Sequence, residues 1–80
     1  MKLTTKEHIE EFLKIVDECS GEVFLTSVMG DMFNLKSEIS RFVIASIFIT
    51  GKGDHLELFC ANAFDESKFI EYFNKHPEVL

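Results

Sequence analysis

Near the start of the chain, apolar residues recur at the spacing of an amphipathic helix. Four of them stand at positions i, i+3, i+4 and i+7, with charged residues between them: Ile9, Phe12, Leu13 and Val16. This period predicts a helix with one buried stripe. Thr4 and Glu7 fit a capping box at its start, and Gly21 can take the left-handed conformation that closes a helix.

After this helix the apolar period changes to two. Residues 22–28 alternate, with Val23 and Leu25 on one side, which predicts a half-buried strand. A turn that contains glycine follows, and residues 32–35 can return as a second strand. Residues 55–61 alternate again and predict a third strand.

The segment between the second and third strands is apolar nearly all round. Ser37 and Glu38 fit the N-cap and first residue of a helix. We expect one stripe to face the sheet: Ile39, Phe42, Val43 and Ile47. The opposite side carries a second set: Ile44, Phe48 and Ile49. Because the segment is rich in β-branched residues, a strand over residues 43–50 is the alternative.

The C-terminal segment predicts a last helix. Asp65 fits its N-cap, and Phe64 just before the cap can pack on Phe69 as a hydrophobic staple. Pro77 prevents the helix from continuing.

Together these elements predict an α+β fold in a single domain that spans residues 1–80. We expect an open-faced two-layer sandwich, with three helices on one face of a short four-stranded antiparallel sheet. Residues 1–3 would supply the first strand. The other sheet face would leave Phe24 and Phe59 partly exposed, or covered by a partner.

Composition narrows the class of protein. The chain is 46% hydrophobic, enough for a core without disulfides, so we interpret Cys19 and Cys60 as buried residues in a reducing cytosol. The net charge of −6 disfavours binding to nucleic acid or to anionic membranes. The N-terminus has no apolar segment typical of a signal peptide, and no apolar run is long enough to span a bilayer. We therefore expect a cytoplasmic protein.

Several segments, taken in order, resemble the HPr family, the histidine-containing phosphocarrier proteins of the bacterial sugar phosphotransferase system. They are the strand around residues 20–26, the Leu35-Lys36-Ser37 segment that opens the second helix, and the final strand and helix over residues 56–62 and 65–71. The resemblance implies an HPr-like fold over most of the chain.

The active loop of that family, Gly-x-His-x-Arg-Pro-Ala, is absent. Thr5 stands at the histidine position, Glu7 at the arginine position and His8 at the proline position. Threonine cannot form a phosphoramidate, and Glu7 would repel a phosphoryl group. We therefore expect no catalytic residue and no enzyme activity. The alternative acceptor is His8. Its simpler interpretation is a surface histidine, because the carboxylates of Glu10 and Glu11 would repel a phosphoryl group at this position.

Two other kinds of site can be weighed. Ser37 aligns with the serine that a regulatory kinase phosphorylates in some HPr proteins, and a phosphate there would meet helix amides. The simpler interpretation is an N-cap serine beside a solvated Lys36.

The spacing of the possible metal ligands along the chain is not that of a metal site. These residues are His8, His55, His76 and Cys60. We therefore expect neither a metal nor a cofactor.

The apolar second helix predicts a partner surface. In the HPr family the corresponding helix docks partners, so Ile44, Phe48 and Ile49 would bind a protein or a second copy of the chain. Alternatively, this segment folds over itself or the open sheet edge. We thus predict an HPr-like domain without phosphocarrier chemistry, acting as a small binding or regulatory module. The alternative function is a working phosphocarrier that uses His8.

Overall fold

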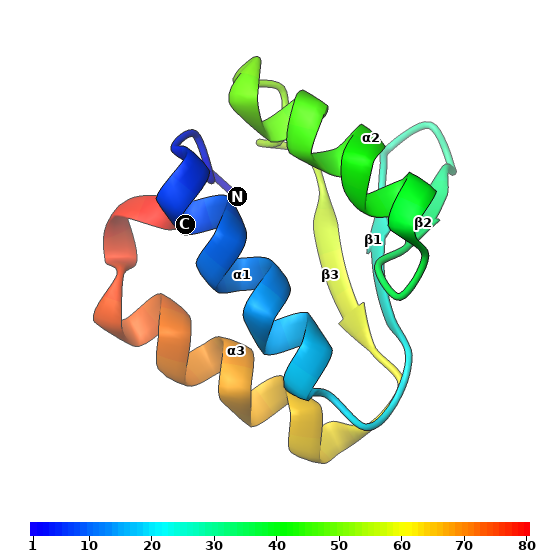
Figure 1. Cartoon of the computed structure of the whole chain (residues 1–80), viewed down its shortest axis with the longest axis vertical. Coiled ribbons are helices and arrows are strands. Elements are labelled where there is room, and N and C mark those ends of the chain that lie inside the picture. The colour runs from blue at the N-terminus through cyan, green and yellow to red at the C-terminus, as the bar shows by residue number, and fades with distance from the viewer.

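The computed structural model describes residues 1–80 and has an α+β fold. Along the chain the elements are α1 (Lys6–Glu18), β1 (Val23–Thr26), β2 (Met32–Asn34), α2 (Glu38–Ile49), β3 (Glu57–Cys60), α3 (Ala63–Lys75) and the 3-10 helix η1 (Pro77–Val79). Helices α1 and α3 lie side by side, and α2 lies nearer to β1 and β2 (Figure 1). No helix combines the length and the apolar character that crossing a membrane requires.

The three strands form one antiparallel sheet in the order β2-β1-β3. Val23 and Leu25 on β1 are buried against the helices, as the alternating pattern predicts. Phe24 on the other face is half-buried and pairs with Phe59 of β3, whose ring centroid lies 6.4 Å away. Because side chains alternate between the faces of a strand, the helices cover one face and leave this aromatic pair on the other.

The core lies between the covered face of the sheet and the three helices. Phe12, fully buried on α1, occupies its centre: its ring centroid is 5.3 Å from that of Phe69 on α3 and 6.2 Å from that of Phe48 on α2. Ile9 and Val16 are buried beside it. The predicted apolar stripe of α1 is therefore confirmed.

The predicted first strand does not form, so the sheet has three strands and not four. Residues 1–3 instead run along the C-terminal segment, where the Lys2 amide donates to the Val79 carbonyl oxygen at 2.6 Å. The N-terminal ammonium group donates to the Gly53 carbonyl oxygen at 3.2 Å. Leu3 and Val79 are both fully buried. A segment this short offers little strand pairing, and burying its leucine with Val79 fixes its path.

Helix α1 begins one residue later than the capping-box prediction. Thr5, not Thr4, is the N-cap, and its hydroxyl oxygen accepts from the His8 amide at 3.2 Å. The interaction is the same kind that the sequence predicts, since a threonine satisfies one of the orphan amides. The predicted pairing of Thr4 with Glu7 is wrong by this single residue.

Helix α3 begins before the predicted cap. Its N-cap is Asn62, whose side-chain oxygen accepts from the Phe64 amide at 2.9 Å. Phe64 is 83% exposed, so the predicted staple to Phe69 is absent. Asp65 falls inside the first turn, and its carboxylate has another role that is described below.

Candidate functional site

Residues 38–49 form a helix, so the alternative strand over residues 43–50 is wrong. The helix is apolar on two sides, as predicted, and Ile47 packs against the core as expected, but most of the other residues lie on the side opposite to the predicted one. Ile44 and Phe48 point inward and are each only 1% exposed, so they cannot serve as a partner surface. The chain passes so close to Phe48 that a Cβ atom on Gly53 would overlap the phenyl ring.

The outward side of α2 carries four exposed apolar side chains, with the exposed Ser46 among them. We call it the α2 outer face and define it by four residues: Ile39, Phe42, Val43 and Ile49. Phe42 is 80% exposed and Ile39 is exposed to a similar extent. The spacing of these residues places them on one side of a helix. Of the three residues predicted to bind a partner, only Ile49 is exposed.

Arg41 fixes which side of α2 faces inward. Its Nε donates to the Leu35 carbonyl oxygen at 2.6 Å, and its Nη2 donates to the Asp17 carboxylate at the end of α1. The hydrogen bond from Arg41 lowers the pKa of Asp17 below its usual value. Arg41 is the only charged residue between Glu38 and the end of α2. Turning the helix over would break both contacts and expose Ile44.

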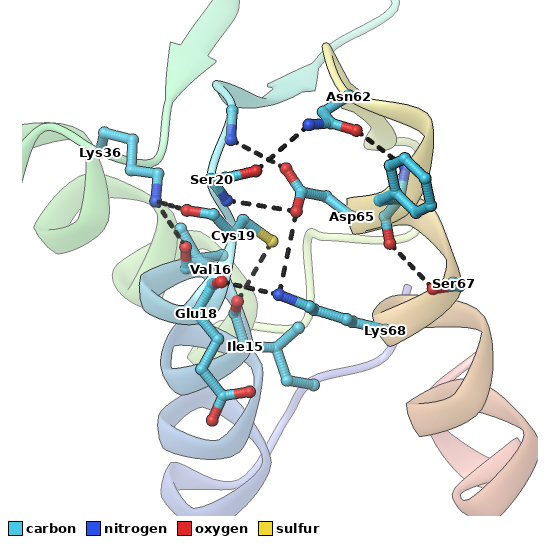
Figure 2. Close-up of polar contacts among 12 residues, drawn as sticks. Ile15, Val16, Glu18, Cys19, Ser20, Lys36, Asn62, Asp65, Ser67 and Lys68 are labelled. Carbon is cyan, nitrogen blue, oxygen red and sulfur yellow. Dashed lines mark hydrogen bonds and ion pairs between the residues drawn. The ribbon is translucent and has the colours of Figure 1, made fainter.

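Ser37 is the N-cap residue of α2, as predicted, but its hydroxyl group makes no capping hydrogen bond. The neighbouring Lys36 is exposed, as expected of a solvated charge, but its ammonium group also has partners within the protein. Its Nζ donates to the carbonyl oxygens of Val16 at 2.8 Å and Cys19 at 2.7 Å, at the C-terminal end of α1 (Figure 2). Phosphorylation of Ser37 stays a prediction, and this lysine is already committed to α1.

The N-terminal end of α1 contains no imidazole at the position that the family uses. Thr5 serves there as the helix cap. His8 lies in the first turn, and its Nε2 is 3.6 Å from a carboxylate oxygen of Glu78. A phosphoryl group on this ring would meet that carboxylate, and like charges repel. His76 is the other neighbour of His8, with ring centroids 5.8 Å apart.

The opposite end of the α1–α3 pair holds a buried polar cluster that the sequence analysis missed. The Asp65 carboxylate is almost completely buried and accepts from the amides of Gly21 at 2.9 Å and Ser20 at 3.2 Å (Figure 2). The Gly21 amide, with help from Ser20 and Lys68, lowers the pKa of Asp65 below its usual value. Lys68 also donates from Nζ to the Glu18 carbonyl oxygen at 2.7 Å.

Gly21 is needed here for space and not for a left-handed turn. Its φ is not positive, unlike that of Gly30 in the turn between β1 and β2. A Cβ atom on Gly21 would lie 3.0 Å from Cβ of Asn62. The amide of residue 21 would still have to donate its hydrogen bond to Asp65. Every buried side-chain nitrogen and oxygen in the molecule has a hydrogen-bond partner. The cluster therefore connects the end of α1 to the start of α3.

The two cysteines are buried, as predicted, and form no disulfide. Burial is the main cause that raises the pKa of Cys60 to about 11, and burial also raises the pKa of Cys19. Since the thiolate is the reactive form, the raised pKa of each thiol lowers its reactivity at neutral pH.

No protein-family model, no curated protein and no solved structure matches this chain. The resemblance to the HPr family is therefore carried by the sequence segments alone.

Proposed function

We propose that the chain is an HPr-like domain without phosphocarrier chemistry that binds a protein partner through the α2 outer face. One observation supports this more than any other: Phe42 is 80% exposed and Ile39 is 79% exposed, on a helix whose opposite side is core. Exposed apolar rows of this kind mark interaction sites. The order of the three helices and three strands matches the predicted HPr-like order apart from its first strand, which does not form here, and this partial match supports the proposed resemblance.

The lack of charge on the α2 outer face indicates how it binds. The chain as a whole carries a net charge of −6, yet the row of residues contains no acid or base. Apolar burial would supply most of the affinity, at roughly 25 cal/mol per Å². The surrounding acidic surface would slow the approach of acidic partners, a second copy included, at low salt. Self-association is the form of binding that can be measured with this chain alone.

The experiment compares two phenylalanines of matched exposure. Phe42→Glu places a charge in the α2 outer face, and Phe64→Glu places the same charge on α3 at an equally exposed position. Solution mass would be measured by light scattering over a range of protein concentration and salt. We expect association in the wild type and in Phe64→Glu, and its loss in Phe42→Glu.

If the wild type is monomeric, the same three proteins are used as bait in a cell extract. A protein retained by the wild type and by Phe64→Glu, but not by Phe42→Glu, would support the proposal. Equal retention by all three baits would overturn it.

The absence of phosphocarrier chemistry has its own test. Incubation with phosphoenolpyruvate and the general phosphotransferase enzyme should leave the chain unlabelled. Stoichiometric acid-labile phosphate that disappears in His8→Ala would instead support the alternative function.

A further inference from the structure

Three side chains able to ligate a metal ion meet where the two ends of the chain come together. His8 lies in the first turn of α1, His76 directly follows α3, and Glu78 belongs to η1. Nδ1 of His76 is 3.2 Å from a carboxylate oxygen of Glu78, and Nε2 of His8 is 3.6 Å from the same oxygen. One donor atom from each residue lies within 4.8 Å of the other two.

We propose that His8, His76 and Glu78 bind one divalent metal ion of the zinc class. Zinc is held at about 2.0–2.1 Å by imidazole nitrogen, which in a tetrahedral site separates neighbouring donor atoms by about 3.3 Å. The distances from Glu78 to the two histidines lie on either side of this value. Two imidazoles and one carboxylate are a known zinc ligand set, and they leave a fourth position for water.

The rings are held in place before any ion arrives. The His76 ring packs on the buried Tyr72, with centroids 4.8 Å apart. The Tyr72 hydroxyl group in turn lies 3.4 Å from the backbone oxygen of His8. The side chains of His8 and His76 are only 22% and 33% exposed, whereas that of Glu78 is 55% exposed. The two imidazoles are thus largely shielded from solvent, and the more exposed carboxylate leaves a route for an ion.

Electrostatics favour a cation at this place. Glu78 supplies a negative charge, and the chain as a whole is acidic, with a net charge of −6. The third histidine, His55, is exposed and lies outside the cluster, which makes it a natural control.

The sequence alone argues against a metal, because the ligands are not grouped along the chain. The fold brings them together by laying α3 beside α1 and returning the C-terminal segment to the first turn of α1 (Figure 1). A bound ion would connect the two ends of the chain. It would therefore stabilise the folded state by mass action, in proportion to its concentration over its dissociation constant.

The test uses the full chain, freed of metal with a chelator and then titrated with Zn²⁺ by calorimetry and with Co²⁺ by visible absorption. We expect one equivalent per chain, cobalt bands typical of low coordination number, and a midpoint of thermal unfolding that rises with Zn²⁺. His8→Ala and His76→Ala should each weaken binding at least about tenfold. His55→Ala should bind like the wild type.

A second readout does not depend on whether the variants fold. In the wild type, one equivalent of Zn²⁺ should shift the imidazole resonances of His8 and His76 in nuclear magnetic resonance spectra and leave those of His55 unchanged. No saturable binding up to millimolar Zn²⁺ would overturn the proposal. Binding that shifts His55, or that is lost equally in His55→Ala, would overturn it as well.

Discussion

Polar side chains hold both ends of the α1–α3 pair, but they do so in different ways. At the end of α1, Asp65 is buried and all its partners come from the protein, mainly the amides of Gly21 and Ser20. At the start of α1, His8 and His76 share a single carboxylate that is more than half exposed. The first cluster has its hydrogen-bonding capacity filled within the protein, whereas the second is open to solvent, and a bound ion there would replace the proton between His76 and Glu78.

This difference is the basis for treating the first cluster as structural and the second as the proposed binding site. A buried carboxylate that accepts from backbone amides stabilises the fold and has nothing left for a ligand. A half-exposed group of imidazoles and one carboxylate adds little stability by itself, because solvent screens it. Its remaining donor atoms are available to an ion. We therefore expect changes at the first end to affect folding, and changes at the second to affect binding.

The largest effect should come from Asp65→Asn. The asparagine can accept at only one atom and carries no charge, so the amides of Gly21 and Ser20 lose a charged acceptor. Urea unfolding at pH 7 should show a greater loss of stability for Asp65→Asn than for Gly21→Ala or His76→Ala. Glu66→Gln, at the exposed neighbouring position, is the matched control and should change little.

Acid should narrow the gap between Asp65→Asn and the wild type. The pKa of Asp65 is lowered in the folded state, so the folded protein binds fewer protons there than the unfolded chain. The stabilisation is complete above the unfolded pKa, for which the ordinary value is 3.8, and is lost as pH falls through the lower folded pKa. As the pH falls below about 5, the free energy of unfolding should therefore decrease less for Asp65→Asn than for the wild type. Parallel pH profiles would contradict this origin of the effect.

A smaller effect should follow from Gly21→Ala. The new methyl group would lie 3.0 Å from Cβ of Asn62, and the backbone must shift while its amide keeps the bond to Asp65. Overpacking of this kind costs about 1–3 kcal/mol. Gly30→Ala is a control that tests the cost of backbone strain alone. Gly30 has positive φ, and no atom lies close to the place where its Cβ would be. A Gly21→Ala midpoint in urea equal to that of the wild type would show that the loop has room to move.

Much of the fold follows from the periods of apolar residues along the chain. The stripe on α1 and the alternation of Val23 and Leu25 each select one buried side, and the structure buries that side. On α2 both sides of the helix are apolar, so the period of apolar residues does not predict which side faces the core. The placement of Arg41 beside Ile44 and Phe48 is settled by its contacts with Asp17 and Leu35, which no local pattern predicts.

The two polar clusters escape sequence analysis for a related reason. Asp65 looks like a helix cap, since its type and place fit one, and only the approach of Gly21 shows its buried role. His8 and His76 stand near opposite ends of the chain, and a search for closely spaced ligands passes over them. Contacts across the fold decide both cases, and spacing along the chain does not report such contacts.

The smallest effect should come from His76→Ala in the presence of a chelator. The variant loses the hydrogen bond between His76 and the exposed carboxylate of Glu78, and the packing of the imidazole on Tyr72. Because the position is partly exposed, this loss should change the free energy of unfolding by only about 0.5 kcal/mol. With Zn²⁺ added, the wild type should gain stability and the variant should not, so the gap between them should widen with ion concentration. Asp65→Asn should gain as much from Zn²⁺ as the wild type does, because its defect lies at the other end of the helix pair. The free energy of unfolding could instead fall as much in metal-free His76→Ala as in Asp65→Asn. That result would mean that the polar clusters at both ends of α1 serve only to stabilise the fold.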